Sequence, residues 1–362
     1  MSKFEKCLIS CLPLMALVAC NNNDEPKTPV ICPTLPTDVV YILNQGNSYS
    51  GIDGSLNVID LENLKSANSV FKTVNGRTLG STPQCGVVYG SKIYVGASES
   101  QTIEVIDRNT YESIQQISLQ NSSTGKSPRS MVATGGKVYI SLYEGYVACL
   151  DTLKCEIEAT TKVGANPDIM CLHQGKLYVP NSEGMNYLEN KPYGTTASVV
   201  TLNPFIEEKV ITVPLNPTKF MSDGSNLFLL CMGDYFMESS AVYKISDESA
   251  EKIADATVAT AGNQTLLIGN NPYVAEGSNL TYTLVDTRTG VKTPVTFADA
   301  PAPSNVGIDP KTGNIIITTY EKPAGMFADY DAPGWTCAYG ADLNLIKKFK
   351  TGSGPAAIFF NE

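Results

Sequence analysis

His173 is the only histidine of this 362-residue chain, so any Ser–His–Asp or Cys–His site would have to use it. It stands in "IMCLHQGKLYV", where an apolar run ends and a turn begins. A ring in such a place usually makes one structural hydrogen bond, and we favour that interpretation. One histidine also excludes a His-rich metal site. We therefore predict no catalytic residue.

Oxygen ligands are the remaining route to a metal site. The segment "ADYDAPG", with Asp329 and Asp331, is the best calcium candidate. It lacks the full spacing of a calcium-binding loop, so we interpret both acids as solvated loop residues. We expect neither a resident metal nor a cofactor.

Aromatic residues gather in seven segments, which are 44–54, 97–101, 142–146, 181–197, 231–240, 275–279 and 319–336. These segments hold 11 of the chain's 30 aromatic residues. Rings bury much area while losing little side-chain freedom, which suits a site for a bulky or flat ligand. The predicted ligand-binding aromatics are Tyr143, Tyr187, Tyr193, Tyr235, Phe236, Tyr320, Phe327, Tyr330 and Trp335. The alternative is that the long segments pack on themselves around these rings.

The elements that must position these residues follow from an internal repeat. An apolar strand, a Gly or Ser turn, a second strand with Tyr, a loop and a third strand recur, as in "TPQCGVVYGSKIYVGASESQTIEVIDRNT" from Thr82. The third strand often ends in Asp, as at Asp107 and Asp151. The marker residues near the start of each unit are Pro83, Pro128, Pro167, Pro217, Gln264, Pro303 and Pro355. Their average spacing of about 45 residues is typical of a four-stranded propeller blade.

The two ends of the repeat region complement each other. "DVVYILNQ" from Asp38 reads as a second strand without a first, and "GPAAIFFNE" from Gly354 reads as a first strand without a second. Either strand alone would leave an unpaired sheet edge. We therefore predict an all-β, seven-bladed β-propeller over residues 38–362, closed by pairing of its N- and C-terminal strands.

In a propeller, the loops between strands two and three share one face with the connections between blades. The aromatic segments are the first set of loops. Polar residues at or beside the blade markers form the second set, namely Gln84, Arg129, Asp168, Thr218, Gln264 and Asn305. We add Gln84, Arg129 and Asp168 to the predicted ligand site. The alternative role for these residues is capping of strand starts.

The repeats resemble those of YncE-like, or YVTN-repeat, seven-bladed propellers. The best match is "KIYVGASESQTIEVIDRNT", from Lys92 to Thr110. The resemblance covers nearly all of the chain after the N-terminal segment. It implies a fold more than a function, because propellers support many activities. A chain with one Trp and one His cannot repeat the GH…WD signature of WD40 proteins.

The N-terminal segment "MSKFEKCLISCLPLMALVAC" has two lysines, an apolar core too short to span a bilayer, and Leu17-Val18-Ala19-Cys20. This ending resembles a bacterial lipobox. It implies a signal peptide over 1–19, lipidation of Cys20 and a polar, Pro-rich tether over 20–37. Asp24 and Glu25 resemble the acidic export signal of Bacteroidetes lipoproteins. The expected location is the outer membrane, through a lipid anchor only and facing the cell exterior.

Charge and cysteine content narrow the function further. The net charge is −10, and no cationic patch for nucleic acid is visible. Seven cysteines follow Cys20, an odd number without metal-binding spacing. Cys149 and Cys155 flank a turn, so a disulfide between them is one option and two buried thiols the other.

Together these features resemble the BtuG family of surface lipoproteins. That resemblance implies capture of corrinoids, meaning vitamin B12 and its relatives, and delivery to a TonB-dependent outer-membrane transporter. It implies a binding protein and not an enzyme. Two alternatives stay open, an adhesion or surface-layer scaffold and a lactonase-type hydrolase. A scaffold predicts rings buried under their own loops, and a hydrolase predicts a carboxylate cluster around the axis.

Overall fold

The computed structural model describes the residues 38–246, 249–270, 280–322 and 328–361. The predicted signal peptide, lipidation site Cys20 and tether lie outside this range, as does Phe327. The chain divides into two compact units, 1–31 and 32–362, and every described residue belongs to the second. Within the described part, no helix has the length and apolar character needed to cross a membrane.

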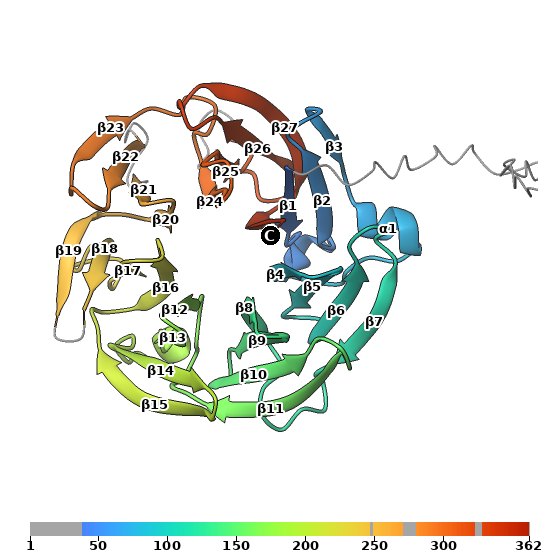
Figure 1. Cartoon of the computed structure of the whole chain (residues 1–362), viewed down its shortest axis with the longest axis horizontal. Helices are drawn as coiled ribbons and strands as arrows, with labels where there is room; N and C mark the ends of the chain where they lie inside the picture. The colour runs from blue at the N-terminus through green and yellow to red at the C-terminus, as the bar shows by residue number, and fades with distance from the viewer. Residues whose placement is uncertain (1–37, 247–248, 271–279, 323–327, 362) are drawn as a thin grey trace, which may run out of the picture. The chain divides into compact units, whose positions relative to one another are not determined.

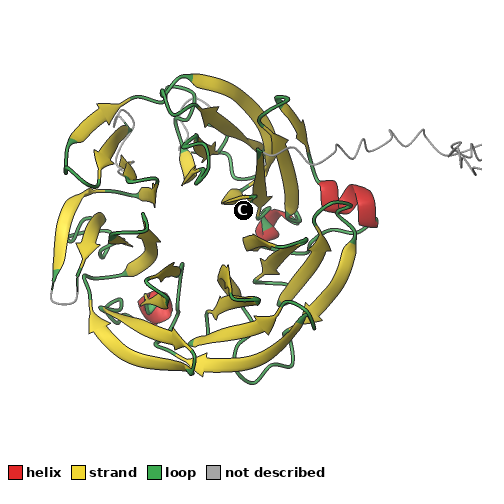
Figure 2. Cartoon of the chain, viewed as in Figure 1, coloured by secondary structure: helices red, strands yellow, loops and turns green. Residues whose placement is uncertain are grey.

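Seven four-stranded antiparallel sheets make up the second unit, and Figure 1 shows them arranged as the blades of a ring. The predicted seven-bladed β-propeller is therefore confirmed. Short 3₁₀ helices η1 (Ser48–Ser50) and η2 (Gly184–Glu189) and one α-helix, α1 (Val70–Asn75), interrupt the connections (Figure 2). The sequence analysis did not anticipate α1.

The blades are numbered here in chain order, and each is given from its innermost strand outwards. Blade 1 is β28 (Pro355–Phe360), β1 (Val39–Asn44), β2 (Ser55–Asp60) and β3 (Lys65–Ala67). Blade 2 is β4 (Pro83–Tyr89), β5 (Lys92–Ala97), β6 (Thr102–Asp107) and β7 (Ser113–Ser118). Blade 3 is β8 (Pro128–Thr134), β9 (Lys137–Leu142), β10 (Tyr146–Asp151) and β11 (Glu156–Lys162).

The remaining four blades follow the same order. Blade 4 is β12 (Cys171–His173), β13 (Lys176–Asn181), β14 (Thr196–Leu202) and β15 (Phe205–Thr212). Blade 5 is β16 (Pro217–Ser222), β17 (Leu227–Cys231), β18 (Ala241–Ile245) and β19 (Ala250–Asp255). Blade 6 is β20 (Val258–Gly262), β21 (Thr265–Asn270), β22 (Thr281–Asp286) and β23 (Lys292–Val295). Blade 7 is β24 (Pro303–Ile308), β25 (Ile315–Thr319), β26 (Pro333–Tyr339) and β27 (Leu345–Ser353).

Blade 1 joins the two ends of the propeller. Strand β28 pairs antiparallel with β1, and Tyr41 stands opposite Phe359 in the register. The two rings stack with centroids 5.2 Å apart. This pairing confirms the predicted closure, in which the C-terminal strand supplies the inner strand that the first segment lacks.

The burial of each strand explains the pattern of apolar and polar residues in the repeat. The second strand of each blade lies between neighbouring sheets, and β1 and β17 are buried along their whole length. Outer strands such as β3 face solvent. Blades approach closely at small residues. A Cβ added to Gly86 would lie 2.9 Å from the Phe359 ring of the adjacent blade, closer than real Cβ contacts allow.

The recurring aspartates end the third strands, as predicted. Asp107 Oδ1 accepts hydrogen bonds from the backbone N–H groups of Asn109 and Thr110, at 2.8 and 3.0 Å. Asp151 makes the same turn in blade 3, with the N–H groups of Leu153 and Lys154. The aspartate thus satisfies backbone donors in the turn between strands three and four.

Two sequence predictions about position are wrong. The marker in blade 6 is not Gln264, which lies in the turn between β20 and β21. The position that matches the other markers is at Thr257 and Val258, where no proline signals the strand start. Trp335 was expected in a loop, but it lies within β26 and pairs with Thr319 and Lys350.

Candidate functional site

The inner strands enclose a cavity of about 420 Å³ at the predicted loop face, called the axial pocket here. Strands β8, β16, β20, β24 and β28 each contribute lining residues, and Figure 1 shows these strands nearest the centre of the ring. The other wall comes from the β9–β10, β13–β14 and β17–β18 loops. Six predicted ligand residues line this pocket, namely Arg129, Tyr143, Asp168, Tyr187, Tyr193 and Tyr235.

A repeated backbone irregularity marks the polar residues of the pocket. The register shifts just after the marker proline in β4, β8, β16 and β24, so one residue per strand is left out of the ladder. Those residues are Gln84, Arg129, Thr218 and Ser304. Such bulges turn a side chain out of the regular alternation. Three of these residues line the pocket, and Gln84 contacts it through Arg129.

Arg129 links three blades at the pocket wall. Its Nε donates to Oδ1 of Asp168 at 2.7 Å and its Nη2 to Oδ2 at 3.3 Å. Its Nη1 donates to Oε1 of Gln84 at 2.7 Å. The attraction of Asp168 raises the pKa of Arg129, so the guanidinium stays charged. Both side chains line the pocket, but that of Asp168 is 6% exposed and that of Arg129 is 36% exposed, so the cation is the more accessible of the two.

Four tyrosines form part of the pocket wall. The Tyr143 ring lies under the Arg129 guanidinium, 5.6 Å from centroid to Cζ. Burial is the main cause that raises the pKa of Tyr143. The rings of Tyr193 and Tyr235 meet edge to face at 5.8 Å, joining the long loops of blades 4 and 5. Tyr187 is 56% exposed at the rim. This wall can hold a flat group against several rings.

Lys219 is a charged pocket residue that the sequence analysis did not name. It follows the β16 bulge, two positions after Pro217, and its Nζ lies 3.4 Å from Oδ1 of Asn305 in β24. Burial lowers its pKa to about 8. Thr218 and Asn305, which were expected near the axis, also line the pocket. The sequence signal that could have identified Lys219 is its position two residues after the marker Pro217. Regular alternation of side chains along the strand, without the bulge, would have predicted that Lys219 points away from the pocket.

The other predicted ligand residues that the structure describes lie outside the axial pocket. Phe236 is 92% exposed at a loop tip. Tyr320 and Tyr330 pack edge to face at 5.0 Å, as the self-packing alternative expected for the blade 7 loop. Trp335 lies beside Lys348 and Lys350, and its Nε1 donates to Glu321 at 2.7 Å.

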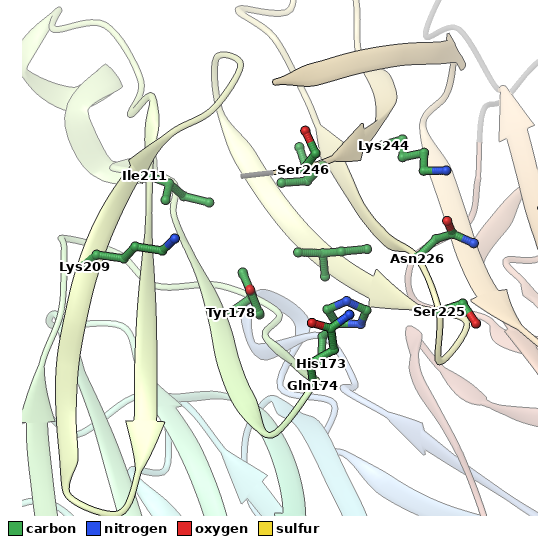
Figure 3. Close-up of a pocket in the computed structure, with 11 residues that line it drawn as sticks. His173, Gln174, Tyr178, Lys209, Ile211, Ser225, Asn226, Lys244 and Ser246 are labelled. Atoms are coloured by element: carbon green, nitrogen blue, oxygen red, sulfur yellow. The ribbon is translucent and has the colours of Figure 1, made fainter. Parts of the chain in front are cut away.

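His173 lines a smaller cavity of about 240 Å³ between blades 4 and 5 (Figure 3). It ends β12, whereas Asp168 precedes that strand, so this cavity and the axial pocket lie at opposite ends of it. His173 Nδ1 is 2.8 Å from Ser222 Oγ. Burial lowers its pKa, and nearby Asp223 opposes the shift. No carboxylate among the described residues hydrogen-bonds to the ring, so the geometry fits a structural hydrogen bond.

The two aspartates of the predicted calcium candidate accept hydrogen bonds from the protein itself. Asp329 Oδ1 accepts two backbone N–H groups, and Asp331 accepts from Asn47 Nδ2 at 2.6 Å, which ties the blade 7 loop to blade 1. Within the described ranges, no group of three or more His, Cys, Asp or Glu side chains could hold a metal ion.

Cys149 and Cys155 are separate thiols. Cys149 lies near Glu158, and Cys155 lies near the carbonyl of Thr152.

Comparison with known proteins establishes the fold and no more. No family model matches the chain, and no curated protein matches it. Many solved structures do match. A candidate 6-phosphogluconolactonase from Bacteroides uniformis is similar with a TM-score of 0.61 and 12% identity, over 90% of this chain and 100% of that one.

Two further solved structures agree with this likeness. A candidate 6-phosphogluconolactonase from Bacteroides fragilis matches with a TM-score of 0.59 and 11% identity, over 92% of this chain and 100% of the other. Hydrazine synthase from Kuenenia stuttgartiensis matches with a TM-score of 0.55 and 16% identity, over 76% and 88%. Identities this low carry the propeller fold but no activity.

Proposed function

We propose that this protein is a lipid-anchored, ligand-capturing propeller that binds a bulky small molecule in the axial pocket. One observation carries the proposal. Tyrosines from the loops of three blades surround the same cavity as Arg129 and Asp168. A concave site that combines aromatic rings with a few fixed polar groups is a usual form of small-molecule site.

Vitamin B12 or a related corrinoid is the ligand we propose first, on the strength of the BtuG resemblance. A corrinoid is larger than a cavity of about 420 Å³, so it would insert one edge and cover the mouth. The tyrosine rings would then lie against its macrocycle or its nucleotide base, and the polar bulge residues would meet its amides. The cavity falls within the size range of ordinary ligand sites.

We further propose that the loop face delivers the ligand to a TonB-dependent transporter in the outer membrane. Apolar loop tips stand beside the pocket, with Phe236 and Met237 each 92% exposed and Leu188 62% exposed. Exposed apolar side chains that gather on one face favour a protein contact. The surface location depends on lipidation of Cys20.

A lactonase-type hydrolase is the alternative that the similar solved structures favour, since two of them are candidate 6-phosphogluconolactonases. Such an enzyme needs a base or a metal-binding carboxylate near the axis. Among the described lining residues Asp168 is the one carboxylate, and Arg129 already binds it. A scaffold is favoured only by the self-packed rings of the blade 7 loop.

Calorimetry with cyanocobalamin on the full chain in detergent tests the proposal. We expect binding that weakens about 30-fold, or about 2 kcal/mol, in Tyr235→Ala and in Tyr143→Ala. Leu153→Ala is the matched control, because Leu153 is 90% exposed in the turn after β10, on the other face. Absence of binding at micromolar protein removes corrinoids. Hydrolysis of 6-phosphogluconolactone by the same preparation would favour the enzyme instead.

A further inference from the structure

Lys219 lines the axial pocket, and none of the described residues gives it an acidic partner. Its hydrogen-bond neighbour is the amide oxygen of Asn305, at 3.4 Å. That oxygen also accepts the N–H of Val306 at 2.8 Å, and the Asn305 amide nitrogen donates to the carbonyl of Ala356 at 2.7 Å. Asn305 is therefore held in place and offers the ammonium one long contact. An ammonium has three donors, so donor capacity remains for another group.

The apolar surroundings of Lys219 make its unpaired charge destabilising. Ile169, Val258 and Ala259 give the pocket wall near the inner strands an apolar surface. Burial in this wall is the cause that lowers the pKa of Lys219 to about 8. Within the described part of the chain, no carboxylate lies within ion-pairing distance of Lys219. A partly buried charge without a counter-ion is destabilising, so a role in binding is the physical reason to retain it.

The charges of the whole pocket point the same way. The charged lining residues that the structure describes are Arg129, Asp168 and Lys219. Arg129 and Asp168 neutralise each other. Lys219 therefore leaves the pocket with a net charge of about +1, in a chain whose net charge is −10. A positively charged cavity attracts anions even though the negative net charge of the whole protein repels them.

We infer that the ligand of the axial pocket carries an anionic group, a carboxylate, phosphate or sulfonate, that pairs with Lys219 while its planar part lies against the tyrosines. This inference rests on the proposed ligand-binding function and specifies the ligand's chemical class. The anion supplies the counter-ion that the pocket lacks, and the amide of Asn305 orients the ammonium toward it.

A pair of probes that differ in charge alone tests the inference. Naphthalene-2-sulfonate and the neutral naphthalene-2-sulfonamide are titrated into the full chain in detergent, with each probe titrated into detergent as the blank. We expect the wild type to bind the sulfonate about tenfold more tightly. Lys219→Met abolishes this preference and leaves sulfonamide binding unchanged, whereas Lys219→Arg keeps it. Equal binding of the two probes by the wild type, no binding of either, or an unaltered preference in Lys219→Met each overturns the inference.

Two further measurements separate binding from folding. Lys219→Met should melt at the same temperature as the wild type or higher, since it removes a partly buried charge that has no counter-ion among the described residues. The affinity of the wild type for the sulfonate should fall between pH 7 and 9, as Lys219 loses its proton, and that of Lys219→Arg should not. The other titratable groups facing the pocket are Arg129, Asp168, Tyr143, Tyr187, Tyr193 and Tyr235. A pH effect that persists in Lys219→Arg comes from them and counts against Lys219.

Corrinoids distinguish failure of this inference from failure of the proposed function. Cyanocobalamin carries a phosphodiester, and dicyanocobinamide lacks it. Cyanocobalamin binding that is unchanged by Lys219→Met keeps ligand capture and removes the anion site. Lys219-dependent sulfonate binding without cyanocobalamin binding keeps the anion site and removes corrinoids. Weakening of cyanocobalamin alone, with dicyanocobinamide unaffected, supports both.

Discussion

The ring of Phe359 stacks on that of Tyr41, with centroids 5.2 Å apart and planes 11° from parallel. The two residues are register partners of β28 and β1, at opposite ends of the described chain. Tyr41 is fully buried and Phe359 is 8% exposed. This contact lies in the core between blades 1 and 2, so the closing strand is part of the hydrophobic core as well as of the sheet.

Deletion of 355–362 should therefore destabilise the whole propeller. It removes the inner strand of blade 1 and exposes the edge of β1. We expect aggregation, or a loss that is large against the roughly 5–15 kcal/mol of a typical domain. Phe359→Ala alone should cost about 3–5 kcal/mol in chemical denaturation. Ile206→Ala, at a 52% exposed site in β15, is the control. A truncated chain that melts within two degrees of the parent contradicts closure by β28.

Removing one member of the Arg129–Asp168 ion pair should destabilise the protein, whereas replacing both members by apolar residues should largely preserve stability. Arg129→Met leaves the Asp168 carboxylate buried and unpaired, and we expect a loss of about 2–4 kcal/mol in denaturant unfolding. Adding Asp168→Leu should restore most of the stability but not ligand binding. Arg288→Met is the control, because the Arg288–Asp286 pair is exposed and should contribute less than about 1 kcal/mol. A double variant no more stable than Arg129→Met would argue against a pairwise effect.

Asp38 should make the protein more stable in mild acid. Burial raises its pKa to about 6, and the nearby carboxylate of Asp309 adds to the shift. The unfolded chain releases this proton near the ordinary pKa of 3.8. Stability from this group is therefore lost as pH rises from about 4 to about 6. Solvent that reaches part of the side chain screens the repulsion.

Asp38→Asn should accordingly stabilise the protein at pH 7, by on the order of 1 kcal/mol. The difference should vanish near pH 3.5, where the native carboxyl is already neutral. Urea unfolding at the two pH values measures both. Glu251→Gln, on the exposed outer strand β19, should change stability by less than about 0.5 kcal/mol at either pH. Equal effects of Asp38→Asn at pH 3.5 and pH 7 would refute the assignment.

Cys20→Ala should prevent lipidation and release a soluble or signal-retained form. The measurement is metabolic labelling with palmitate, followed by fractionation of the outer membrane. Cys32→Ala is the matched control, because it removes a nearby thiol that is not part of the lipobox. If Cys20→Ala still labels and stays in the outer membrane, the lipobox interpretation is wrong.

Repeat spacing and strand alternation were sufficient to predict seven blades, the closing pairing of β28 with β1 and the face that carries the long loops. These features depend on local patterns, because each blade must bury the same strands against its neighbours and end the same turns with aspartate. Blade 6 was misplaced by a few residues because its first strand begins at Val258 without a proline. Trp335 was assigned to a loop because β26 begins with Pro333-Gly334, a dipeptide that is typical of turns.

The composition of the axial pocket was decided by tertiary structure. Arg129, Asp168 and four tyrosines were predicted for one face, but only the folded ring shows that they share a cavity while Tyr320, Tyr330 and Trp335 do not. Lys219 is the plainest case. Its charge is visible in the sequence, but its direction depends on a bulge in β16. Its lack of an acidic partner within the described residues depends on which blades face it across the ring. Sequence periodicity specifies which residues enter the inner strands, and the closed ring determines which of them meet.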